Sequence, residues 1–111
     1  MTRFKTTALV LFAALTVGAG ISSASAETRF QDNHPRRAEV LARAHNEDRR
    51  ITDARRDGDL NARQAHRLRV ADRHVVRQEQ RMAARHGGYI TRHEQLRLNH
   101  EENRISRHIP D

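Results

Sequence analysis

The chain has 111 residues, 21 of them Lys or Arg against 14 Asp or Glu, a formal net charge of +7, eight histidines and no cysteine. The lack of cysteine excludes disulfide bonds and thiolate metal sites. With 36% hydrophobic and 4% aromatic residues, so short a chain buries only a small core, which favours self-association or a loose helical hairpin.

The first residues predict a secretory signal peptide. Arg3 and Lys5 precede an uncharged, mostly apolar run over residues 6–20, and Ala24-Ser25-Ala26 has the form of a cleavage site. The alternative is an uncleaved membrane anchor, but the strongly apolar stretch is shorter than the roughly 20 residues that span a bilayer. We expect a signal peptide over residues 1–26 and a periplasmic or secreted bacterial protein. Cleavage leaves 85 residues with a charge of +5, and every remaining basic side chain apart from histidine is arginine.

Residues 27–33 are expected to be a short linker, and residues 34–109 a single helical domain. The domain is rich in Arg, Ala, Glu, Gln and Leu, with Pro only at its margins. Asp32-Asn33-His34-Pro35 is typical of a helix start. The first helix is predicted over residues 34–56. Apolar residues recur there every three or four positions, interrupted by Glu47 and Asp48.

Two short segments with the same pattern predict the connections. Each has a glycine to end one helix, an apolar residue, an Asn or Thr to cap the next helix, and a Gln or Glu three residues later to complete a capping box. The first segment contains Gly58, Leu60, Asn61 and Gln64, and the second contains Gly88, Ile90, Thr91 and Glu94. The further helices are then expected over residues 62–86 and 92–108. The predicted fold is all-α, a three-helix array or extended helical hairpin with two capping-box hinges.

A similar sequence recurs late in each helix: an acid or amide, an acid, any residue, an arginine, a large aliphatic residue and a small one. These repeats make Arg50, Arg81 and Arg104 candidate partner-binding residues, able to pair with acids across a seam between helices. Alternatively the charges lie on solvated faces and pair within a helix, as Glu39 with Arg43 would.

Metal sites are not predicted. The first hinge resembles a calcium-binding loop, but Arg55 occupies a ligand position and Gln64 cannot supply the closing carboxylate. His93, His100 and His108 are spaced by seven and eight residues, too far apart for one helical site. Only histidines that converge from different helices could bind a metal. We therefore expect no cofactor, with a histidine-based metal-buffering or metal-sensing protein as an alternative function.

Enzymatic activity is not expected, because no nucleophile motif or phosphate loop is present and the core is too small for a closed pocket. No catalytic or cofactor-binding residues are predicted. The basic charge would suit nucleic acid, but export, scarce aromatic residues and interspersed acids exclude that partner. An anionic membrane or envelope surface remains an alternative partner.

Two resemblances follow from these residues. The His34-Pro35-Arg36-Arg37 start, the two hinges, Leu98-Asn99, Glu102-Asn103 and Ser106-Arg107 resemble a group of small exported bacterial helical proteins of unknown function. Leu60-Asn61-Ala62-Arg63-Gln64 and Ile90-Thr91-Arg92-His93-Glu94 also resemble the paired Leu-Thr-x-x-Gln motifs of the Spy and CpxP periplasmic chaperones. That family consists of basic, all-helical dimers that hold unfolded clients or report envelope stress. The second resemblance implies a non-enzymatic binding protein that self-associates and holds a protein partner or unfolded client.

Overall fold

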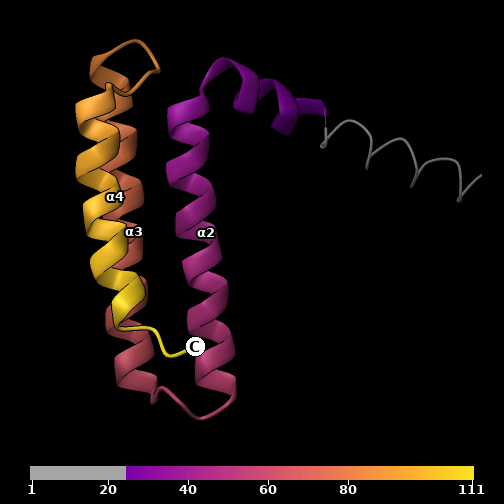
Figure 1. Cartoon of the computed structure of the whole chain (residues 1–111), viewed down its shortest axis with the longest axis vertical. Coiled ribbons are helices and arrows are strands. Elements are labelled where there is room, and N and C mark those ends of the chain that lie inside the picture. The colour runs from indigo at the N-terminus through magenta and orange to yellow at the C-terminus, as the bar shows by residue number, and fades with distance from the viewer. Residues whose placement is uncertain (1–24) are drawn as a thin grey trace, which may run out of the picture. The chain divides into compact units, whose positions relative to one another are not determined.

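Three helices form the body of the protein in a computed structural model that describes residues 25–111 (Figure 1). Helix α2 runs Pro35–Arg56, α3 runs Ala62–Arg85 and α4 runs Arg92–Arg107. The described residues contain no strand, so the predicted all-α fold with three helices and two hinges is confirmed. The signal peptide prediction falls on residues that lie, apart from Ser25 and Ala26, outside the described part of the chain.

The segment before α2 is helical over residues 25–33, where the sequence suggested a linker over residues 27–33. Nothing between Glu27 and Asn33 breaks a helix. The break comes at His34, at φ −134° and ψ 62°, because the ring of Pro35 disfavours the α conformation in the residue before it. His34 makes no side-chain cap hydrogen bond to α2, and Pro35 starts that helix. Within residues 25–111, no helix combines the length and apolarity needed to cross a bilayer.

Glycines in the left-handed region end α2 and α3. In the first hinge Gly58 has φ 84°, and the N–H of Asp59 donates to Ala54 O at 2.9 Å. In the second hinge the corresponding bond runs from Gly88 N–H to Ala83 O at 2.8 Å. The residue that corresponds to Gly58 is therefore Gly87, which has φ 66°. Gly87 therefore ends α3, whereas the repeat had assigned that role to Gly88. Gly88, at φ 99°, adds one residue to this hinge.

Both predicted capping boxes are present. Asn61 Oδ1 accepts from the N–H of Gln64 at 2.8 Å, and Gln64 Oε1 accepts from the N–H of Asn61 at 2.9 Å. Thr91 and Glu94 make the same pair of bonds at 3.1 and 2.8 Å. The backbone hydrogen bond from Thr91 is the largest cause of a lowered pKa at Glu94. Each box thus satisfies amides that the first turn of a helix leaves unpaired.

Each of the three helices packs against the other two. Their buried residues recur at alternating spacings of three and four, as in a coiled coil, and Leu60 and Ile90 from the hinges join them. The apolar core includes Val40, Ile51, Val75 and Leu98, each no more than 1% exposed. Four positions of the same pattern hold carboxylates instead: Glu47, Asp72, Glu79 and Glu102.

Candidate functional site

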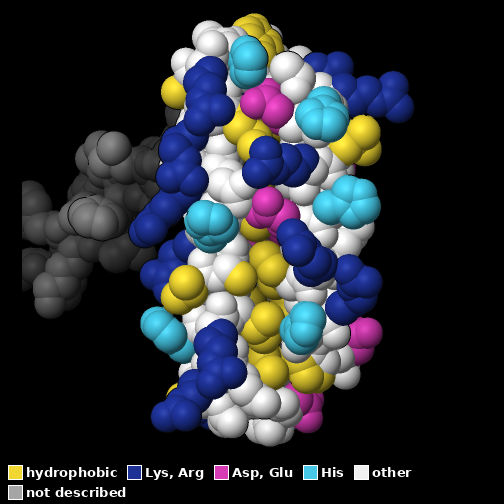
Figure 2. Space-filling view, turned by 90° about the vertical axis from the view of Figure 1, so that its left-hand side faces the viewer, with side chains coloured by type: hydrophobic (Ala, Val, Ile, Leu, Met, Phe, Trp, Pro, Cys, Tyr) yellow, Lys and Arg dark blue, Asp and Glu magenta, His cyan; other side chains and the backbone are white. Residues whose placement is uncertain are grey.

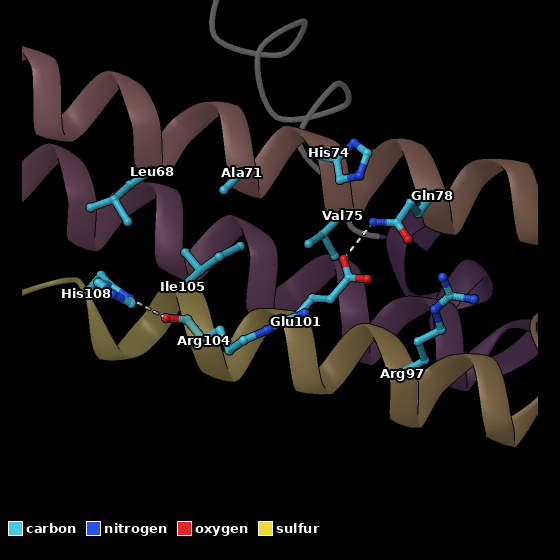
Figure 3. A pocket seen from close by; sticks show the side chains of 10 residues that line it. All are labelled: Leu68, Ala71, His74, Val75, Gln78, Arg97, Glu101, Arg104, Ile105 and His108. Atoms are coloured by element: carbon cyan, nitrogen blue, oxygen red, sulfur yellow. Dashed lines mark hydrogen bonds between the residues drawn. The ribbon is translucent and has the colours of Figure 1, made fainter.

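An open groove of about 530 Å³ lies between α3 and α4. Leu68, Ala71 and Val75 of α3 face Ile105 of α4 across its apolar part (Figure 3). Leu68 and Ala71 are only partly buried and pack against the core cluster, so the groove exposes the edge of the hydrophobic core. A smaller hollow of about 290 Å³, lined by Leu60 among others, adjoins it at Leu68.

The rim of the groove is basic and contains histidine. Arg97 and Arg104 project from α4, His74 lies on α3, and His108 directly follows the end of α4 (Figure 3). An apolar strip bordered by arginine and histidine side chains is visible on this face of the molecule (Figure 2).

The acidic residue of the rim, Glu101, is held by Gln78 on the facing helix. Gln78 Nε2 donates to Glu101 Oε2 at 2.6 Å, and this bond crosses the groove between the apolar floor and Arg97 (Figure 3). A side chain that entered the groove would therefore meet hydrocarbon below and mostly positive or protonatable groups at the edges.

The three arginines proposed as partner-binding residues lie in different surroundings. Arg104 is exposed on the rim of the groove. Arg50 contacts the last turn of α4 and the segment after it: it donates to Ser106 Oγ at 2.7 Å and to Asp111 Oδ1 at 2.9 Å. Arg81 is exposed outside the groove lining. Among the described residues, neither Arg81 nor Arg104 pairs with an acid, so the predicted seam does not form at these two positions.

Other polar side chains link the helices instead. Glu39 accepts hydrogen bonds from Gln95 and, at 3.0 Å, from Asn99, while Arg43 donates to Asn103 Oδ1 at 2.6 Å. These bonds join α2 to α4, so Glu39 and Arg43 serve helix packing and do not form the intrahelical pair that their spacing suggested. The first turn of α2 also holds the second hinge, since Arg36 donates to Ile90 O at 3.3 Å.

One of the four buried carboxylates has a cationic partner. Glu79 is fully buried, and Arg37 of α2 binds both of its oxygens. Arg37 also donates to Gly88 O at 3.2 Å. Two hydrogen bonds from a planar guanidinium compensate much of the cost of burying a carboxylate.

The other three carboxylates meet one another. Glu47 of α2, Asp72 of α3 and Glu102 of α4 each offer an oxygen, and these oxygens all lie within 4.8 Å of one another. The residues are 3%, 5% and 0% exposed. Glu47 Oε2, Asp72 Oδ1 and both oxygens of Glu102 are buried without a hydrogen-bond partner. We call Glu47, Asp72 and Glu102 the carboxylate triad.

The triad disfavours full ionisation. Burial raises the pKa of Asp72 to about 7, and the charges of Glu47 and Asp48 add to the shift. Burial also raises the pKa of Glu102 to about 9, a side-chain hydrogen bond with Glu47 and the charges of Glu47 and Asp72 add to the shift, and Arg43 acts in the opposite direction. Like charges in a medium of low dielectric constant repel strongly, so the triad needs protons or a cation.

The sequence analysis treated Glu47 as an interruption of an apolar face and did not identify Asp72 or Glu102 as site residues. A signal was present, because Asp72 lies four residues after Leu68 and three before Val75, at a core position of the heptad pattern. The convergence of histidines that the alternative metal-binding function would require is not seen: within the described residues, the one group of three metal-binding side chains contains no histidine.

Comparison of the chain with protein-family models, curated proteins and solved structures finds no match.

Proposed function

We propose that the protein is a non-enzymatic, exported helical binding protein that holds apolar segments of other proteins in the groove between α3 and α4, in a chaperone-like role. The observation that supports this proposal most directly is the apolar floor of Leu68, Ala71 and Ile105 beneath an arginine and histidine rim. A three-helix bundle with an open groove offers the position that a fourth, amphipathic helix occupies in helix bundles and helix-in-groove complexes.

The charges favour one chemistry of client. Arg97 and Arg104 lie seven residues apart on α4, two helical turns along the same side of the groove. They suit carboxylates that flank an apolar stretch, because a guanidinium group donates to both oxygens of a carboxylate. The preferred client is thus an unfolded or helical segment with apolar residues next to Asp or Glu. A second copy of this basic chain is a poorer match to an arginine rim.

Export completes the proposal. The predicted signal peptide places the chain in the periplasm or outside the cell, where a chaperone works without ATP. The resemblance of both hinges to the paired motifs of the Spy and CpxP chaperones supports the same role. Protein expressed from the whole sequence should have the intact mass of a chain that begins at Glu27. A mass that includes residues 1–26 would contradict export.

The functional test compares two double variants. Arg97→Glu with Arg104→Glu reverses the rim, and Arg49→Glu with Arg56→Glu makes the same changes at the same spacing on the exposed side of α2. Both variants have the same net charge, and all four side chains are exposed. The assay follows aggregation of a reduced, acidic client at increasing ratios of protein to client.

The wild type and the α2 variant should suppress aggregation equally, whereas the rim variant should need at least about tenfold more protein, the equivalent of about 1.4 kcal/mol of binding free energy. Equal suppression by all three would refute the groove as the client site, and no suppression by wild type would refute the chaperone-like role. Sedimentation equilibrium of the same samples tests self-association. A dimer that covers the groove would assign this face to a second copy.

A further inference from the structure

The carboxylate triad differs from the remaining buried charge of the bundle. Glu79 has Arg37 against it, but no arginine, lysine or histidine forms an ion pair with Glu47, Asp72 or Glu102 in residues 25–111. Buried polar atoms are nearly always hydrogen-bonded, because an unpaired one loses its water without replacement. Four buried oxygens in one layer of a small core, without a cationic side chain paired to them, therefore need either protons or a bound cation.

The separation of the oxygens suits a metal ion. Three atoms no more than 4.8 Å apart can all lie within about 2.8 Å of a common centre. Bonds to Mg²⁺ are about 2.0–2.1 Å and those to Ca²⁺ about 2.3–2.6 Å, so side-chain rotations that move each oxygen by about 0.2–0.8 Å close the site. The three carboxylates could offer six oxygens if each bound in bidentate fashion.

The donor set selects the class of ion. Oxygen-only sites suit Mg²⁺, Ca²⁺ and Mn²⁺, whereas ions that prefer thiolate or imidazole need donors that the triad lacks. We propose that Glu47, Asp72 and Glu102 bind one such oxygen-preferring divalent cation between α2, α3 and α4. Because each helix contributes one ligand, the bound ion ties all three helices together, and its binding free energy stabilises the folded bundle.

The site is independent of the groove. Glu101 and Ile105, on either side of Glu102 in the sequence of α4, line the groove, whereas Glu102 is fully buried in the interior. A failed metal test would therefore leave client binding untouched, and a failed client test would leave the metal site untouched.

The test uses Mn²⁺ as the probe. Protein produced from the full sequence is stripped with a chelator, exchanged into metal-free buffer near neutral pH and titrated with Mn²⁺, with free ion followed by electron paramagnetic resonance and heat by calorimetry. The variants are Glu102→Gln and Asp72→Asn, which keep side-chain size but remove a charge. Asp53→Asn is the matched control, because it makes the same change at an exposed position of α2. Circular dichroism checks that each variant is helical.

Wild type and Asp53→Asn should bind one ion per chain and melt at a higher temperature with Mn²⁺ than without it. Glu102→Gln and Asp72→Asn should bind at least about tenfold more weakly, with little change in melting temperature on addition of the ion. Competition by Mg²⁺ or Ca²⁺ identifies the preferred member of the class. The proposal is overturned if folded wild type shows no saturable binding at millimolar Mn²⁺. It is also overturned if the triad variants bind as tightly as wild type, since the ion would then occupy other residues.

Discussion

Replacing Glu102 with Gln should stabilise the metal-free protein. The substitution retains the shape of the side chain and removes the ionisable carboxyl group of a residue that is fully buried beside Glu47 and Asp72. In the unfolded chain this carboxyl ionises with its ordinary pKa of 4.5, whereas burial and its acidic neighbours raise the pKa to about 9 in the folded protein. Folding at neutral pH thus requires Glu102 to take up a proton, and Gln does not.

The expected gain in the free energy of unfolding follows from that difference in pKa. Each pH unit between the unfolded pKa and the working pH costs about 1.4 kcal/mol, so at about pH 7.5 the protonation of Glu102 costs about 4 kcal/mol. Burying the amide of Gln recovers less than this full amount, because its N–H groups also need partners. We expect Glu102→Gln to raise the free energy of unfolding by between about 2 and 4 kcal/mol.

The pH dependence has a definite sign. For a carboxyl whose folded pKa is raised, the folded state binds more protons than the unfolded state, so stability falls as pH rises. For Glu102 the fall extends from its ordinary pKa up to about 9, and for Asp72 from 3.8 to about 7. The free energy of unfolding of metal-free wild type should therefore fall by about 1.4 kcal/mol per pH unit for each proton taken up on folding. That of Glu102→Gln should fall less.

Urea unfolding followed by circular dichroism, in chelator, measures both effects at about pH 5.5, 7 and 8.5. Asp53→Asn controls for the loss of one surface charge. Equal stability of wild type and Glu102→Gln across this range, or a wild type that becomes more stable as pH rises, would refute the account of the triad. With saturating Mn²⁺, wild type should become more stable than Glu102→Gln, because wild type gains a ligand that the variant binds poorly.

Three further predictions concern the hinges and the buried ion pair. Thr91→Ala should lower the free energy of unfolding by about 1 kcal/mol through loss of the cap to α4, and a urea midpoint equal to that of wild type would contradict the capping box. Gly87→Val should cost more than about 1–2 kcal/mol, since a β-branched residue resists positive φ, and a thermal melt that matches wild type would show that Gly87 does not end α3. Arg37→Ala should cost about 3 kcal/mol by leaving Glu79 buried and unpaired, and adding Glu79→Gln should restore part of the loss; if the double variant is no more stable than Arg37→Ala, repulsion by the unpaired charge is not the cause.

The helix boundaries could be predicted from the sequence because local chemistry sets them. A glycine that accepts positive φ and a cap with its reciprocal Gln or Glu act within a few residues, so α2, α3 and α4 begin and end within a residue of the expected positions. The same local reasoning missed the insertion in the second hinge, because Gly87 and Gly88 are adjacent and both fit the pattern.

The candidate site was less predictable, since it depends on how each helix is rotated about its axis. Glu47, Asp72 and Glu102 converge only because all three occupy core positions of the heptad pattern at the same level of the bundle. The spacing of residues within one helix does not reveal which residues of the other helices lie at the same level of the bundle. For the same reason Arg50, Arg81 and Arg104, which match in the repeat, have three different environments: the C-terminal segment, an open surface and the groove.

Binding of the client in the groove between α3 and α4 can be tested most directly by site-specific photo-crosslinking. A photoreactive amino acid replaces His74, which lines the groove, or His66, an exposed histidine of the same helix outside it. Each protein is irradiated with a reduced, acidic client, and the crosslinked product is quantified. If the groove binds the client, position 74 should give a client adduct and position 66 little or none. Equal adducts from both positions, or a stronger one from position 66, would show that clients bind elsewhere on the surface.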